Sequence, residues 1–153
     1  MKKFLAIVGA VAVVIVIAGA GLAAYVARET RAFNESSKVS VDANLPPIIS
    51  TWSEEALITR ASPQLLKIVN TNPGQFGQLF QKLSQLGAMQ SYGGAKGSSR
   101  VSYTLGEGKV VVAAYVATAK FQNGDARITV RLVQVANEWQ LLYFNVNSPL
   151  FLE

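Results

Sequence analysis

The sequence predicts an α+β fold in which an N-terminal transmembrane helix precedes two or three short helices packed on a four-stranded antiparallel meander. Three patterns lead to this prediction. Residues 4–27 carry no charge. Apolar residues recur at helical spacing over residues 45–87, and they alternate with polar residues from about residue 89 onward. Helices followed by a run of strands indicate a sheet covered by helices on one face.

The uncharged segment follows a short positive head formed by Lys2 and Lys3. As a helix, its 24 residues would be about 36 Å long, which exceeds the roughly 30 Å of bilayer hydrocarbon. A cleaved signal peptide is the alternative, because Ala18-Gly19-Ala20 has the small-x-small pattern of a cleavage site. The apolar run continues past this site to Val26, which favours a retained signal-anchor.

The positive head favours a cytoplasmic N-terminus and an exported C-terminal domain. We therefore expect a single-pass protein of a bacterial inner membrane, with its C-terminal domain in the periplasm. Residues 1–27 are expected to form the signal-anchor, with the membrane contacted through residues 4–27. Residues 28–44 have balanced charge and are expected to form a polar tether, and residues 45–153 the exported α+β domain. Continuation of the membrane helix to about Ser36 is the alternative for the first part of this segment.

Proline and capping residues mark the starts of three helices. Pro46-Pro47 opens a segment whose apolar residues share one face. Ser62-Pro63 combines an N-cap with proline in the first turn, and Asn72-Pro73 repeats this signal. The third helix is expected to end at Gly87. Its apolar stripe consists of Phe76, Leu79, Phe80, Leu83 and Leu86.

Strand patterns occupy the second half of the chain. A short strand at residues 89–92 is expected before a glycine-rich loop at 93–97. Asn123-Gly124 is a strong signal for a two-residue hairpin turn, and residues 136–138 form the last turn. The four main strands are expected at residues 100–105, 109–121, 127–132 and 139–146.

The hairpin turn predicts which side chains share a face of the sheet. A two-residue Asn123-Gly124 loop pairs Phe121 with Ala126 and continues to pair Ala117 with Val130. The resulting face is apolar and includes the small side chains of Ala113, Ala117 and Ala119. Because small side chains let a helix approach closely, we expect the stripe of the third helix to cover this face.

The opposite face is expected to gather basic side chains. Lys120 would face Arg127 across the hairpin, and Arg100 and Arg131 would lie nearby. Leu142 and Phe144 are expected to join them, although a one-residue slip in the last turn would send both to the core. This surface is a candidate site for anionic lipid headgroups or an acidic protein. Ordinary solubilisation of an exposed sheet face is the alternative explanation.

Composition excludes several kinds of chemistry. The chain has no cysteine and no histidine, which excludes disulfides, thiol nucleophiles, Cys/His zinc sites and imidazole-based catalysis. Glu54 and Glu55 are adjacent in sequence and would point in different directions on a helix. Lys96 precedes Gly97, so the glycine-rich segment lacks Walker spacing. The modest positive charge after Ala27 does not indicate a nucleic-acid partner. We therefore expect no catalytic residue, metal site or cofactor.

The order of short helices, the helix end at Gln85-Leu86-Gly87 and the closing meander resembles the cystatin-like and nuclear-transport-factor-2-like superfamily. The relevant segment, residues 117–149, is ATAKFQNGDARITVRLVQVANEWQLLYFNVNSP. The similarity is to small exported bacterial members, and more loosely to membrane-anchored assembly factors of cytochrome oxidase. It implies a helix-covered sheet. Enzymes of this superfamily use an aspartate or histidine inside the cone of the sheet. The acids Glu107, Asp125 and Glu138 are instead expected in turns.

These patterns lead to two hypotheses about function. The first is a non-enzymatic, membrane-anchored extracytoplasmic interaction or assembly-accessory protein, whose partner is another envelope or inner-membrane protein. The second is a small-molecule or lipid-binding domain that uses the concave face of the sheet. A homodimer through the outer face is compatible with both hypotheses.

Overall fold

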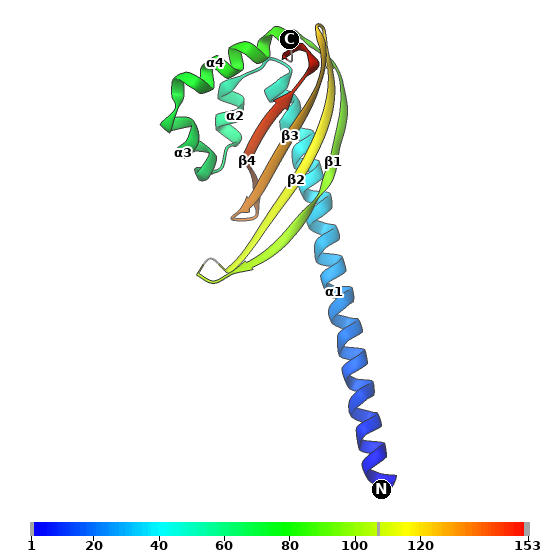
Figure 1. Ribbon diagram of the computed structural model, residues 1–153. Coiled ribbons are helices and arrows are strands. Elements are labelled where there is room, and N and C mark those ends of the chain that lie inside the picture. Colours follow the sequence, from blue (N-terminus) through cyan, green and yellow to red (C-terminus); the bar gives the residue numbers. More distant parts are fainter. Residues whose placement is uncertain (1, 107, 152–153) are drawn as a thin grey trace. The chain divides into compact units, whose positions relative to one another are not determined.

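The computed structural model describes the backbone of residues 2–106 and 108–151, and the side chains of residues 21, 23–25, 27–106 and 108–151. The chain divides into two compact units, one ending at Phe33 and one beginning at Asn34. The helices are α1 (Lys2–Ile49), α2 (Glu54–Arg60), α3 (Pro63–Thr71), α4 (Pro73–Leu83) and the short 3₁₀ helices η1 (Ser84–Leu86) and η2 (Pro149–Phe151). The strands are β1 (Met89–Thr104), β2 (Gly108–Phe121), β3 (Gly124–Val135) and β4 (Glu138–Asn147) (Figure 1).

The predicted α+β class is confirmed, with one antiparallel sheet in the order β1-β2-β3-β4. Among the described residues, no helix is long and apolar enough to span a membrane. Most side chains of the predicted transmembrane segment, residues 4–20 together with 22 and 26, lie outside the described part of the chain. The transmembrane helix therefore stays a prediction.

The segment expected to be a polar tether, residues 28–44, is helical throughout and belongs to α1. From Asn34 onward this helix is part of the compact unit, and Val41, Leu45, Ile48 and Ile49 are buried. Their spacing of four, three and one residues places them on one helical face. For residues 34–44 the tether prediction was wrong, because intervening polar residues concealed this stripe.

The helix expected to open at Pro46-Pro47 is also corrected, because both prolines lie in the last turn of α1. Proline lacks the N–H that continues a helix, and α1 ends two residues later at Ile49. The amide of Ser50 donates to the carbonyl of Pro46 (2.8 Å). The chain then reverses direction at Trp52, whose φ is +49°.

The two later helix starts are confirmed. Ser62 caps α3 by accepting a hydrogen bond from the amide of Leu65 (3.3 Å), and Pro63 follows in the first turn. Pro73 likewise opens α4. The expected stripe is buried only in part, because Leu79 is exposed whereas Phe80, Leu83 and Leu86 are buried.

The segment expected to be a glycine-rich loop is a strand. β1 continues through residues 93–97, and its pairing with β2 is irregular between Met89 and Ser91 and between Tyr92 and Ala95. The loop prediction failed because these glycines accommodate bulges and close strand contacts rather than ending the strand.

The β2–β3 register differs from the predicted one by two residues. Phe121 pairs with Gly124 and Ala117 with Ile128, so the turn residues are Gln122 and Asn123. Segment 85–88 holds this turn, since the amide of Gln122 donates to the carbonyl of Ala88 and that of Asn123 to Leu86 (both 2.9 Å). A shift of two residues leaves each side chain on its predicted face.

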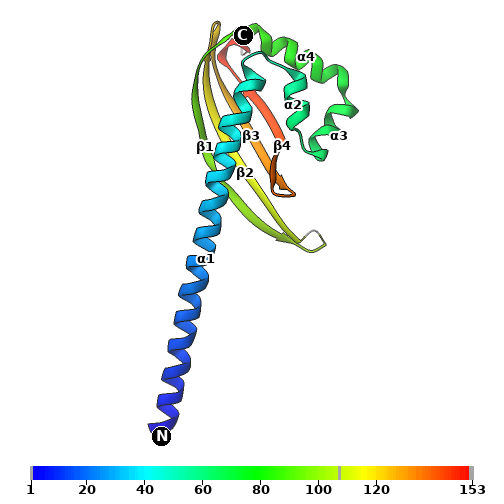
Figure 2. The same ribbon diagram turned by 180° about the vertical axis from the view of Figure 1, so that it is seen from behind.

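The alanine-rich inner face of the sheet is covered by α1 rather than by the stripe of α4 (Figure 2). Ala95, Ala113, Ala117 and Ala119 are buried on this face, in one core with the apolar stripe of α1. The aromatic ring of Phe80 in α4 instead packs near β4, with its centroid 6.1 Å from that of Phe144. Helix α1 contacts β1 and β2 through both apolar and polar side chains.

The polar contacts set the position of α1 along the strands. Asn34 Oδ1 accepts hydrogen bonds from the amide (2.7 Å) and hydroxyl (2.6 Å) of Ser99. The hydroxyls of Ser37 and Tyr115 are 2.8 Å apart. Eight residues beyond Asn34, Asp42 Oδ1 accepts from the amide of Ala95 (3.1 Å). The contacts to Ser99 and Ala95 lie in order along β1, and Tyr115 of β2 lies between their levels because it pairs with Gly97, so sliding the helix would break all of these contacts.

The carboxylate of Asp42 is stabilised by its neighbours. Burial alone would raise its pKa, but hydrogen bonds from Lys38 (2.5 Å), from the hydroxyl of Tyr92 (2.8 Å) and from the amide of Ala95 lower the pKa below its usual value. Burial and the adjacent carboxylate raise the pKa of Tyr92, which therefore remains a hydrogen-bond donor.

Replacing Asp42 should change the acid sensitivity of the fold. A carboxyl with a lowered folded-state pKa stabilises the protein above its ordinary value of 3.8, and this contribution is lost as the pH falls through the folded-state pKa. We expect Asp42→Asn to destabilise the full chain near neutral pH, with the difference from wild type narrowing below about pH 4. Chemical denaturation of both proteins in detergent across pH measures this effect. A constant difference down to pH 2 would contradict the assignment.

Gly97 should be intolerant of a side chain. A Cβ at this position would overlap the carbonyl oxygen of Ala114 and lie 2.8 Å from the Cα of Tyr115, both of which belong to the paired strand β2. We expect Gly97→Ala to lower the free energy of unfolding by about 1–3 kcal/mol. Gly74→Ala is the matched control, because its Cβ would meet nothing within 4 Å. Equal stability of the two variants would disprove the predicted clash.

Candidate functional site

The face of the sheet turned away from α1 carries most of the basic side chains of the strands. We call this surface the cationic face and define it by Lys96, Arg100, Lys120, Arg127 and Arg131, all of which are exposed. Its acidic side chains in the described strands are Asp125 and, at the β3–β4 turn, Glu138. Because cations outnumber acids, this face attracts negatively charged groups.

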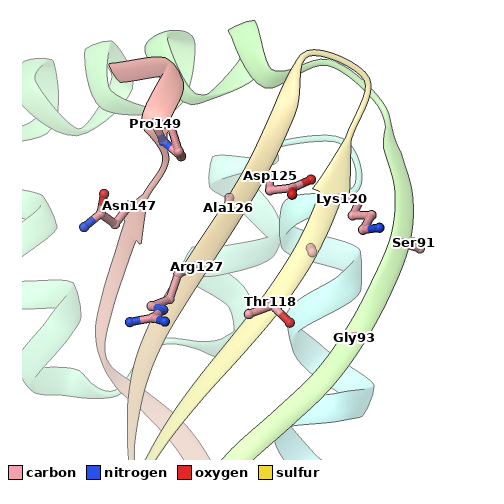
Figure 3. Close-up of a pocket in the computed structure, with 10 residues that line it drawn as sticks. Ser91, Gly93, Thr118, Lys120, Asp125, Ala126, Arg127, Asn147 and Pro149 are labelled. Carbon is pink, nitrogen blue, oxygen red and sulfur yellow. The ribbon is translucent and has the colours of Figure 1, made fainter. Parts of the chain in front are cut away.

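One part of the cationic face is hollow, with a volume of about 420 Å³. Figure 3 shows Lys120 on the β1 side of the hollow and Arg127 on the β4 side, with Asp125 and Thr118 between them. Ser91 and Asn147 add a hydroxyl and an amide at opposite sides. The hollow thus combines two cationic groups with neutral hydrogen-bonding groups.

Irregular strand geometry borders the hollow. On one side the β1 bulge brings Gly93 against Thr118, where a Cβ would lie 2.7 Å from Thr118 Oγ1. On the other side the hydroxyl of Ser148 donates to the carbonyl of Asp125 (2.6 Å), which holds the chain after β4 beside β3. One border therefore depends on a contact between β1 and β2, and the other on a hydrogen bond from the residue after β4 to β3.

The two cations of the hollow, Lys120 and Arg127, are available to bind a ligand. Neither Lys120 nor Arg127 forms an ion pair or side-chain hydrogen bond with any described residue. Lys120 is the cross-strand neighbour of Asp125, and Arg127 of Thr118. Arg131 lies further along the face, with its guanidinium 5.2 Å from the ring centroid of Tyr143. An ammonium and a guanidinium in this setting can bind carboxylate, phosphate or sulfate oxygens.

The structure brings together four of the six predicted site residues, namely Arg100, Lys120, Arg127 and Arg131. Lys120 and Arg127 do not pair directly as expected, because of the two-residue difference in register. Lys96 was missed because its segment was expected to be a loop. The alternation of polar Lys96, Ser98 and Arg100 with inward-facing residues was the signal that could have revealed it.

Of the other two predicted site residues, Phe144 does not join the cationic face. A register irregularity opposite Arg131 and Leu132 leaves Leu142 without a strand partner, and Phe144 pairs with inward-facing Val130. Phe144 therefore packs against the core. The slip that was considered as the alternative occurs through this bulge, and Tyr143 takes the outward position opposite Arg131.

A second, smaller hollow of about 160 Å³ lies beside α2 and the β3–β4 turn. Its Arg60 is already engaged, since Nε donates to Asn44 Oδ1 (3.0 Å) and Nη1 to the carbonyl of Ala56 (2.9 Å). Within the described residues there is no cluster of acidic, histidine or cysteine side chains that could hold a metal ion. The hollow on the cationic face is therefore the better candidate site.

Comparisons of the chain with protein-family models, curated proteins and solved structures gave no match. The candidate site is thus argued from its own geometry.

The cations of the hollow should contribute little to folding. Because Lys120 and Arg127 are exposed and lack ion-pair partners in the described chain, we expect Lys120→Ala with Arg127→Ala to change the free energy of unfolding by less than about 1 kcal/mol. Tyr115→Phe, which removes a buried hydroxyl bonded to the carbonyl of Asn34 (3.0 Å), should cost about 1–3 kcal/mol. Urea denaturation of the double variant, of Tyr115→Phe and of the wild type measures these changes in the free energy of unfolding. A larger loss for the double variant would assign its cations a structural role.

Proposed function

We propose that this chain is a non-enzymatic, membrane-anchored interaction or assembly-accessory protein of the bacterial envelope, which recognises an acidic partner protein through the cationic face. In this proposal residues 4–27 cross the inner membrane once and the C-terminal domain lies in the periplasm. A relationship to the cystatin-like and nuclear-transport-factor-2-like superfamily is part of the same proposal. The relationship to this superfamily is supported by the antiparallel meander packed on a long helix.

The observation that carries the proposal is the set of exposed cations on a sheet face that the helices leave open, of which Lys120 and Arg127 form no ion pair or side-chain hydrogen bond with a described residue. Exposed apolar groups lie among them, since Val116 is 38% and Tyr143 is 42% exposed. Arginine and tyrosine are enriched at protein interfaces and often dominate binding energy. The stacked Arg131–Tyr143 pair is therefore the expected centre of the contact, with Lys120 and Arg127 steering an acidic surface toward it.

A symmetric homodimer through this face is disfavoured by its charge. A two-fold interface brings the same patch of each copy together, which would oppose the two sets of cations. An acidic partner avoids this repulsion. The hollow supports a second candidate function, binding of a small anionic molecule, because its volume lies within the usual range of ligand sites.

The partner proposal predicts a charge-dependent interaction. Tagged full-length protein is extracted from native membranes in mild detergent, and co-purifying proteins are quantified. We expect Arg127→Glu with Arg131→Glu to reduce a stoichiometric acidic partner about tenfold or more, a loss equivalent to at least about 1.4 kcal/mol. The control, Lys67→Glu, removes an exposed cation of α3 that lies off the sheet, and should retain the partner.

Three results bear on the alternatives. Equal recovery of the partner with both variants would reject the cationic face as its site. Native mass spectrometry that detects a small anion lost on Arg127→Glu, with no protein partner, would favour the second candidate function. Intact mass of the purified chain shows whether residues 1–27 are retained, which tests the signal-anchor separately.

A further inference from the structure

The end of the β1–β2 hairpin exposes two neighbouring apolar side chains. Tyr103 is 76% exposed and Leu105, just beyond β1, is fully exposed. They precede a turn whose Gly106 and Gly108 have φ values of +96° and +71°. β2 pairs with β3 only from Val112 onward, so this end is a two-stranded ribbon that extends past the β3–β4 turn (Figures 1 and 2).

This hairpin lies at the end of the sheet where the chain enters the C-terminal unit. Asn34, the first residue of that unit, is bonded to Ser99 of β1, whereas Asp42 is bonded to Ala95, further from the turn. Leu105 is six residues beyond Ser99, or about 20 Å along an extended chain. The hairpin tip and the start of the unit are therefore at the same end.

The chain between the predicted anchor and this unit is short. Ala27 and Asn34 are seven residues apart, a distance that cannot exceed about 25 Å even in a fully extended chain. An anchor formed by residues 4–27 would thus keep the hairpin end of the sheet near the bilayer surface. This step rests on the membrane anchor of the proposed function.

The chemistry of the tip suits a bilayer interface. Tyrosine concentrates at headgroup level, and a leucine beside it can reach the acyl chains. The exposed basic residues Arg100 and Lys109 lie on the same ribbon and suit anionic headgroups. Two apolar side chains are too few for a stable protein interface, which needs about 800 Å² on each partner.

We infer that the β1–β2 hairpin is a second membrane contact, in which Tyr103 and Leu105 insert into the interfacial layer of the bilayer that holds the anchor. Two attachment points, the anchor and the hairpin, restrict rotation of the C-terminal unit. The cationic face is then presented to partners in a restricted orientation.

The absence of cysteine from the sequence allows a site-specific test. Leu105→Cys and Tyr103→Cys are made separately in the full chain, so that each variant keeps the other apolar side chain. Gln78→Cys, at an exposed position of α4 away from the hairpin, is the control (Figure 1). Each protein is labelled with an environment-sensitive fluorophore and reconstituted in nanodiscs of phosphatidylethanolamine and phosphatidylglycerol.

We expect blue-shifted emission and several-fold stronger quenching by acyl-chain nitroxides at positions 103 and 105 than at position 78. Protein that co-elutes with nanodiscs but gives the same aqueous signal at all three positions would overturn the hairpin contact and leave the anchor standing. Full-length protein that elutes free of nanodiscs would overturn the anchor, and the hairpin inference with it.

Discussion

The packing of the second half of α1 against the alanines of the inner sheet face is the contact on which the C-terminal unit depends. Val41, Leu45, Ile48 and Ile49 are almost completely buried. Full burial of such side chains stabilises a protein by about 1.5–3 kcal/mol each. Alanine at positions 95, 113, 117 and 119 keeps the sheet surface low enough for the helix to approach. Larger residues in either layer would hold the two apart.

The position of α1 restricts where the other helices can pack on the sheet. Helices α2 to α4 occupy the β4 side of the same face, where the ring of Phe80 packs on that of Phe144. All described helices longer than one turn in this unit therefore lie on one face, and the other is left to the solvent (Figure 2). Polar and charged side chains on that face avoid the cost of exposing an apolar sheet. The same arrangement makes its cations accessible to a partner.

The polar groups between α1 and the strands add direction to an apolar contact that is otherwise non-directional. Asn34, Ser37 and Asp42 each bind a different level of the sheet. This order aligns the start of the unit with the hairpin end. It leaves the hollow toward the opposite end, near the β2–β3 turn. Within this unit, the α1 segment therefore starts at the end that carries the β1–β2 hairpin, and the hollow lies toward the other end.

The sequence by itself determined the α+β class, the meander order, the cap of α3 and the proline start of α4, because these depend on local periodicity, proline and capping groups. It also determined that Arg100, Lys120, Arg127 and Arg131 share a face, since alternation along a strand survives a two-residue change in register. Only the tertiary structure decided that residues 34–49 form the central helix and that β1 continues through its glycines. It also decided that a bulge turns Phe144 inward and that Lys120 and Arg127 line one hollow. These features arise from contacts between segments far apart in the chain, such as those of segment 85–88 with the β2–β3 turn, and local patterns do not encode them.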